Sequence, residues 1–122
     1  MKEIHLIRHA ESEANAAIDV DNPTNYFDAK ITEKGKLQAQ KKYEEYKSLN
    51  FDAYYCSPLT RALETFSIIF PNKKPIIIDS IREHLYHSCD VGRQPKLLKK
   101  EFPNFDFDNL NDYWWNNNVI ID

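Results

Sequence analysis

The order of its apolar segments is the feature of this sequence that most restricts its fold. Short apolar stretches at 3–8, 52–56 and 75–79 each resemble a β-strand, and the two segments between them carry helical signals. Strands that alternate with helices are expected to lie parallel, joined by right-handed crossovers. The sequence therefore predicts an α/β fold with three layers, in which helices flank a mostly parallel sheet.

The first and third of these stretches are the most apolar. The first contains Ile4, Leu6 and Ile7, and the third contains three consecutive isoleucines. A strand that is apolar at nearly every position is typical of the centre of a parallel sheet, where both faces are covered. We therefore expect both segments to be buried.

The first predicted helix begins after Thr32, a residue type that caps helix N-termini, and Glu33 is favourable in the first turn. One face of this helix would be formed by residues at spacings of four, four and three: Gly35, Ala39, Tyr43 and Tyr46. Charged residues occupy the other positions. The pattern predicts a helix that runs to about Ser48 with one buried face.

The second predicted helix has Ser57 as its cap and Pro58 at its first helical position. Its buried stripe would consist of Leu59, Leu63, Phe66 and Phe70. Pro71 cannot continue the helix and would end it. With this start, Arg61 would be the fourth residue after the cap, and its side chain would lean back toward the N-terminus.

Length and composition limit the classes of protein to consider. The 122 residues predict a single domain spanning 1–122. A net charge of -3 gives no support for nucleic-acid binding, and no apolar run approaches the roughly 18 residues that a membrane span needs. Two cysteines are too few for a disulfide framework, and the N-terminus lacks a secretory signal, so we expect a cytoplasmic protein.

Polar residues follow each predicted strand, where ligands bind in parallel sheets. His9, Ser57 and Asp79 stand at these three exits, and Arg8 and Arg61 flank two of them. Guanidinium groups bind phosphate oxygens through paired, charge-assisted hydrogen bonds, and a neutral imidazole can attack phosphorus. The pattern therefore indicates a site for a phosphoryl group.

Several motifs resemble those of the histidine phosphatase superfamily, also called the phosphoglycerate mutase-like family. They occur in the family's order between Lys2 and about Glu83, and more loosely as far as Trp115. The motifs are Arg8-His9-Ala10, Asn15, the segment 32–39, the Ser-Pro-Leu-x-Arg-Ala run at 57–62, and Arg82-Glu83. The resemblance implies a phosphoglycerate mutase-like α/β fold, shortened at its C-terminal end.

The resemblance also implies a mechanism that needs no metal and no cofactor. His9 would attack the phosphorus of a small phosphorylated substrate and become a phosphohistidine. Glu83 would protonate the leaving oxygen and later activate water. The phosphate would be bound by Arg8, Asn15, Ser57 and Arg61.

A second active-site histidine of the family, usually in a Ser/Thr-His-Gly triplet, is not found in this sequence. Three explanations remain open: a fragment or a naturally shortened relative, a homodimer in which a second copy completes the sheet edge, or substitution by His84 or His87. Three functions remain open as well. The first is a metal-independent phosphatase acting on a small phosphomonoester, the second is a weakly active or inactive phosphate-binding module, and the third is a phosphoglycerate-type mutase.

Overall fold

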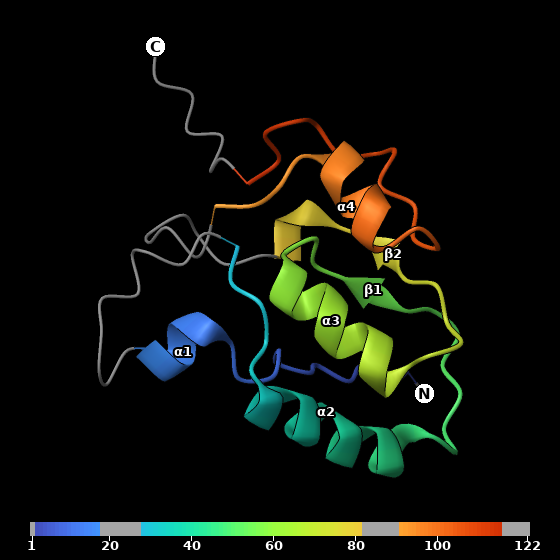
Figure 1. Ribbon diagram of the computed structural model, residues 1–122. Helices are drawn as coiled ribbons and strands as arrows, with labels where there is room; N and C mark the ends of the chain where they lie inside the picture. The colour runs from blue at the N-terminus through green and yellow to red at the C-terminus, as the bar shows by residue number, and fades with distance from the viewer. Residues whose placement is uncertain (1, 18–27, 82–90, 116–122) are drawn as a thin grey trace.

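The computed structural model describes residues 2–17, 28–81 and 91–115 (Figure 1). In chain order the elements are α1 (Glu13–Ala17), α2 (Glu33–Tyr46), β1 (Tyr55–Cys56), α3 (Thr60–Ile69), β2 (Ile76–Ile77), the 3₁₀ turn η2 (Asp79–Ile81) and α4 (Pro95–Glu101). None of the helices in these ranges has the length and apolarity that a membrane crossing requires.

Strands β1 and β2 form a parallel pair, with Tyr55 opposite Ile76 and Cys56 opposite Ile77. Backbone hydrogen bonds extend the pairing by one residue on each side, from the Ile76 N–H to the Tyr54 carbonyl (2.7 Å) and from the Ile78 N–H to the Cys56 carbonyl (3.0 Å). Helix α3 connects the two strands. The prediction of an α/β fold with parallel strands is therefore confirmed in this part of the chain.

The first predicted strand, 3–8, is not a strand in the structure, and the expectation that it is buried is wrong. Ile4 is 84% exposed and Leu6 is 93% exposed. A strand needs a neighbour that accepts and donates its ladder hydrogen bonds, and in the described residues this segment belongs to no sheet. The third predicted strand is only partly buried, because Ile77 is 8% exposed while Ile76 is 52% exposed.

Helix α2 follows its prediction closely. The Thr32 hydroxyl accepts a hydrogen bond from the Gly35 N–H at 3.0 Å, as a helix cap does. Gly35 and Ala39 are buried, and the helix ends at Tyr46. A Cβ atom at Gly35 would lie 2.3 Å from the backbone oxygen of Glu11, so only glycine allows this close approach.

Helix α3 begins later than predicted. Its first residue is Thr60 and its N-cap is Leu59, so Ser57 is not the cap and Arg61 is the second helical residue instead of the fourth. The Ser57 hydroxyl instead accepts from the Leu59 N–H at 3.3 Å. The predicted end is correct, because the helix stops at Ile69, two residues before Pro71.

Helix α3 packs against both α2 and β1, and Figure 1 shows it between them. Its residues therefore contribute to two apolar clusters. The smaller cluster joins α2 and the N-terminal segment and contains Ala10, Ile31, Ala39 and Ile69. The larger one joins the strands, α4 and the aromatic segment after it, and contains Cys56, Leu59, Leu63, Phe66, Ile77, Leu98, Phe105, Phe107 and Trp114.

Candidate active site

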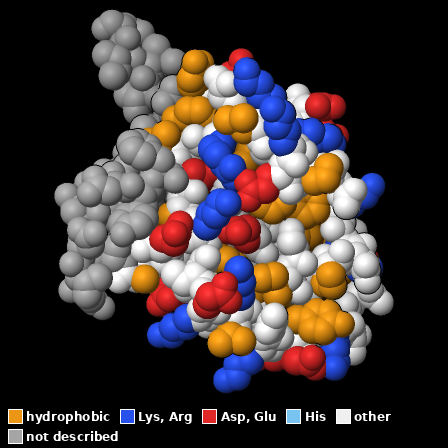
Figure 2. Space-filling view, viewed as in Figure 1, with side chains coloured by type: hydrophobic (Ala, Val, Ile, Leu, Met, Phe, Trp, Pro, Cys, Tyr) orange, Lys and Arg blue, Asp and Glu red, His pale blue; other side chains and the backbone are white. Residues whose placement is uncertain are grey.

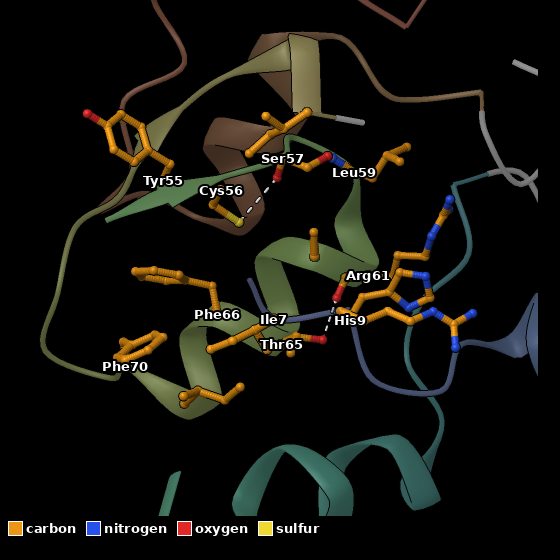
Figure 3. Close-up of a pocket in the computed structure, with 14 residues that line it drawn as sticks. Ile7, His9, Tyr55, Cys56, Ser57, Leu59, Arg61, Thr65, Phe66 and Phe70 are labelled. Atoms are coloured by element: carbon orange, nitrogen blue, oxygen red, sulfur yellow. Dashed lines mark hydrogen bonds between the residues drawn. The ribbon is translucent and has the colours of Figure 1, made fainter. Parts of the chain in front are cut away.

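A cavity of about 270 Å³ lies between the segment around His9, strand β1 and helix α3 (Figure 3). Its polar lining residues include Arg8, His9, Ser57, Arg61 and Thr65. Much of the remaining lining is apolar and comes from Ile7, Leu59, Ala62, Phe66, Ile69, Phe70 and Ile81. The cavity is therefore lined partly by charged and polar side chains and partly by apolar ones.

Four residues that the sequence placed in a phosphate site line this one cavity: Arg8, His9, Ser57 and Arg61. They come from two separate stretches of the chain, around position 8 and between 57 and 61, and Figure 3 shows His9 and Arg61 at the same end of the cavity. Two cationic side chains and an imidazole around one cavity match the requirements of a phosphoryl group.

The other predicted site residues lie elsewhere or are not described. Asn15 is in α1 and is not part of the cavity lining; its side-chain oxygen accepts hydrogen bonds from the N–H and the hydroxyl of Ser12, both at 3.1 Å. Asp79 also does not line the cavity, whereas Ile81, two residues later, does. Glu83, His84 and His87 lie outside the described residues.

The imidazole of His9 is held in one tautomer. Its Nδ1 atom lies 2.7 Å from the backbone oxygen of Ala10. A carbonyl oxygen can only accept, so Nδ1 carries the hydrogen in this contact. In the neutral ring the lone pair then belongs to Nε2, which is the form of the side chain that acts as a nucleophile.

Thr65 connects the histidine segment to α3, and sequence reasoning did not single it out. Its Oγ1 accepts from the Ala10 N–H at 3.0 Å and donates to the Arg61 carbonyl at 2.7 Å. One hydroxyl therefore links the backbone beside His9 to the backbone of Arg61. The only sequence signal for this role is the spacing of four residues from Arg61, which places both on one helix face.

Arg61 is only 2% exposed, in the first turn of α3, whereas Arg8 is exposed. The N-terminal end of a helix carries partial positive charge, which favours an anion, although here the first N–H group, that of Thr60, already donates to Asp28. Arg61 adds a full positive charge at that end. The local electrostatics therefore suit a negatively charged ligand.

The thiol of Cys56 also lines the cavity, but its environment makes it unreactive. Burial raises the pKa of this thiol to about 12, and the sulfur donates to the Ser57 carbonyl at 3.3 Å. At neutral pH the thiolate form is therefore negligible, and the thiolate is the nucleophilic form of cysteine. Among the described lining residues, His9 is the side chain best suited to attack phosphorus. In the same described ranges, no cluster of His, Cys, Asp and Glu has the arrangement of a metal site.

A partly buried polar network, centred on the buried Asp28, lies at the start of α3 and was not predicted. Asp28 forms an ion pair with Arg93 (Nε to Oδ2, 3.0 Å), and Arg93 also contacts Glu101 (Nη1 to Oε2, 2.7 Å). Burial alone would lower the pKa of the Arg93 guanidinium, but its hydrogen bonds with Glu101 and Asp28 outweigh this effect and raise the pKa. Arg93 thus remains charged inside the network.

Comparison with known proteins agrees with the geometry. The model of the histidine phosphatase superfamily (branch 1) matches residues 4–118. The chain is 31% identical, over 102 residues, to the 2,3-bisphosphoglycerate-dependent phosphoglycerate mutase of Neisseria gonorrhoeae, a match that covers 81% of this chain and 43% of that protein. It is 37% identical over 81 residues to the mutase of the same name from Thermoplasma acidophilum, covering 65% of this chain and 39% of the other.

A solved structure from Escherichia coli, assigned as an alpha-ribazole-5'-P phosphatase, superposes with a TM-score of 0.54 at 27% sequence identity. This match covers 78% of the present chain and 47% of the other. The chain thus spans less than half the length of the curated relatives it matches. Because the family model matches nearly the whole chain, from residue 4 to residue 118, the chain belongs to the histidine phosphatase superfamily.

Proposed function

We propose that the protein hydrolyses a small phosphomonoester, without a metal ion or other cofactor, through a phosphohistidine at His9. The observation that carries this proposal is the placement of His9, Arg8 and Arg61 around one cavity. The Nδ1 contact of His9 with a carbonyl supports it further, because that contact leaves Nε2 as the attacking atom.

In the first step, Nε2 of His9 forms a bond to phosphorus and the bond to the ester oxygen breaks. Glu83 gives a proton to the departing oxygen. In the second step, Glu83 takes a proton from water, the water attacks the phosphohistidine, and the nitrogen–phosphorus bond breaks to release phosphate. Arg8 and Arg61 neutralise the charge on the phosphoryl oxygens, with Ser57 as a further ligand. Asn15 stays a predicted ligand that does not line the cavity in this structure, and it would have to donate through its amide N–H₂.

A phosphoglycerate-type mutase is the second candidate, because two of the relatives carry that name. A mutase would keep the phosphoryl group on His9 and return it to a different hydroxyl. Incubation with a monophosphoglycerate and catalytic bisphosphoglycerate separates the two reactions. A phosphatase releases inorganic phosphate, whereas a mutase produces the isomer without net release.

A phosphate-binding module without catalysis is the third candidate, since the sequence lacks the Ser/Thr-His-Gly triplet. His84 and His87 are our candidates for the missing imidazole. A protein of this third kind would bind vanadate or phosphate but release no product from any phosphomonoester.

The test of the phosphatase proposal is turnover of p-nitrophenyl phosphate with and without a chelator, combined with phosphoryl labelling. We expect turnover that the chelator does not change, and an acid-labile label on His9. His9→Ala should remove both signals. His5→Ala is the matched control, because His5 is exposed and its Nδ1 contacts the Tyr46 hydroxyl at 3.1 Å, outside the cavity lining. Labelling that survives in His9→Ala would show that this nucleophile is wrongly assigned.

We also propose that the protein acts in the cytoplasm and associates as a homodimer. The exposed Ile4 and Leu6 support association, because apolar side chains on a segment that pairs with no strand in the described part of the chain favour contact with a second copy. A sedimentation experiment that finds only monomer across the accessible concentration range would exclude the dimer.

On the face seen in Figure 2, acidic and basic side chains are interspersed among apolar ones, which favours a small phosphorylated substrate over nucleic acid as the partner.

A further inference from the structure

Helix α3 begins without a cap of its own. Its N-cap residue is Leu59, whose side chain cannot accept a hydrogen bond. The first N–H groups of a helix have no partner inside the helix, and a buried N–H needs an acceptor from elsewhere. The first helical residue, Thr60, is fully buried, so its N–H depends on another part of the chain.

That acceptor is Asp28, which is 5% exposed and belongs to a distant segment. Its Oδ1 accepts from the Thr60 N–H at 2.9 Å, and its Oδ2 accepts from the Thr60 hydroxyl. The backbone of Asp28 has a φ of 39°, in the left-handed region that Asn, Asp and Gly tolerate best. The carboxylate therefore performs the work of a helix cap from outside the helix.

Arg93 completes the arrangement from the other side. Its Nε donates to Asp28 Oδ2 at 3.0 Å, and its Nη2 donates to the Thr60 hydroxyl. The carbonyl of Arg93 in turn accepts from the Trp114 indole N–H at 2.8 Å. Because both ends of Arg93 are held, the buried carboxylate that it contacts has little freedom to move.

Arg61 follows Thr60 directly, so this network fixes the position of the Arg61 backbone, from which its side chain extends. The Arg61 carbonyl is held by Thr65 on its other side. We propose that Asp28, supported by Arg93, positions Arg61 for a phosphate by fixing the first turn of α3 through Thr60. The proposal rests on the phosphate site inferred above and assigns a positioning role to a residue that does not line the cavity.

The test compares binding of inorganic phosphate to the full chain, followed by nuclear magnetic resonance, in five proteins. These are the wild type, Arg61→Gln, Asp28→Gly, Asp28→Asn and Phe51→Leu. Gly and Asn both tolerate the backbone at position 28, so neither change adds strain there. Asn keeps an oxygen acceptor for the Thr60 N–H and Gly does not. Phe51 packs against Phe70, just beyond the C-terminal end of α3, and serves as the control for general destabilisation.

We expect Asp28→Gly to raise the phosphate Kd about tenfold, measured well below the melting temperature of the variant. The reason is that displacing the Arg61 guanidinium by about 1 Å would weaken its hydrogen bonds to phosphate. Asp28→Asn should recover only part of this loss, because its oxygen can accept from the Thr60 N–H but its amide N–H₂ cannot accept from Arg93, and Phe51→Leu should bind like the wild type. In Asp28→Gly, the amide hydrogens of the first turn of α3 should also exchange faster.

Two results would overturn the proposal in distinguishable ways. If the wild type does not bind phosphate, the phosphate site itself fails and the positioning role fails with it. If the wild type binds phosphate and Arg61→Gln does not, but Asp28→Gly binds as tightly as the wild type, only the positioning role of Asp28 fails.

Discussion

Helix α3 and the segment 2–9 border the same cavity, yet they are held in very different ways. In α3, Leu63 is completely buried and Arg61 is 2% exposed. In the N-terminal segment, Ile4 and Leu6 are largely exposed. Both sequences are rich in apolar residues, so composition alone does not explain the difference.

The difference lies in the partners that each segment finds. A helix satisfies its own backbone hydrogen bonds and needs only a surface for its apolar stripe, which α2 and β1 supply to α3. An extended segment needs a neighbouring strand for its backbone before its side chains can pack. Apolar residues therefore predict burial only where such a neighbour is present.

The largest effect that would sharpen this comparison is on stability. Leu63→Ala should lower the free energy of unfolding by about 2–5 kcal/mol, because it removes a fully buried side chain and leaves a cavity. In the monomer, at protein concentrations below those at which the proposed dimer forms, Leu6→Ala should change it by less than about 0.5 kcal/mol, because Leu6 is 93% exposed in the single chain. Urea unfolding of both variants measures this. Equal losses would mean that the two regions are buried alike in solution, for instance within an oligomer.

A second, smaller effect concerns the link between the two regions. Thr65→Val keeps the shape of the side chain but leaves the Ala10 N–H without its acceptor at 3.0 Å. We expect the free energy of unfolding to fall by about 1–3 kcal/mol, the cost of an unsatisfied buried donor. The decisive measurement is hydrogen exchange at the Ala10 amide, which should accelerate more than exchange in the middle of α3. If the Ala10 amide exchanges as slowly as in the wild type, the hydroxyl is not the link.

The smallest effect is electrostatic. Burial raises the pKa of Glu64 on α3 above its ordinary value of 4.5, against the opposing effect of a hydrogen bond from the Ile31 N–H (2.9 Å). The folded state then binds the proton more tightly than the unfolded chain, so the stability from protonated Glu64 is complete below the ordinary pKa and is lost as pH rises through the raised value.

Glu64→Gln keeps the oxygen acceptor and removes the charge. The variant should match the wild type near about pH 4 and gain stability relative to it toward about pH 7, by less than about 1 kcal/mol because Glu64 is only half-buried and water screens its charge. Thermal unfolding across this pH range measures the gain. A constant difference between the two proteins at all pH values would contradict the role of the charge.

The sequence predicted those features that depend on neighbouring residues. The cap at Thr32, the buried face of α2 and the end of α3 before Pro71 all follow from residues within one or two helical turns. The start of α3 was mispredicted because its acceptor, Asp28, lies 32 residues before Thr60. A cap formed across such a separation leaves no local pattern.

The candidate site follows the same rule. The convergence of His9, Arg8, Ser57 and Arg61 was expected because each residue stands at the exit of a predicted strand or at the start of a helix. Asp28, Arg93 and Thr65 were not expected, since their roles come from contacts with distant backbone groups. Asn15 was expected to bind substrate; in this structure its side-chain oxygen accepts from Ser12 and it does not line the cavity, and its role in binding stays a prediction.

One side of the cavity is formed by the buried helix α3 and the other by the more exposed N-terminal segment, and this difference has a consequence for how the proposed activity would be lost. The imidazole stands on the loosely held wall, whereas the buried guanidinium stands on the tightly held one. Mild heat or low denaturant should therefore detach His9, the proposed nucleophile, first, through a sub-global opening of the N-terminal segment, while the hydrophobic core stays closed. Loss of the proposed turnover at His9 and loss of the fold would then have separate midpoints, and the N-terminal segment would set the temperature at which the proposed activity is lost.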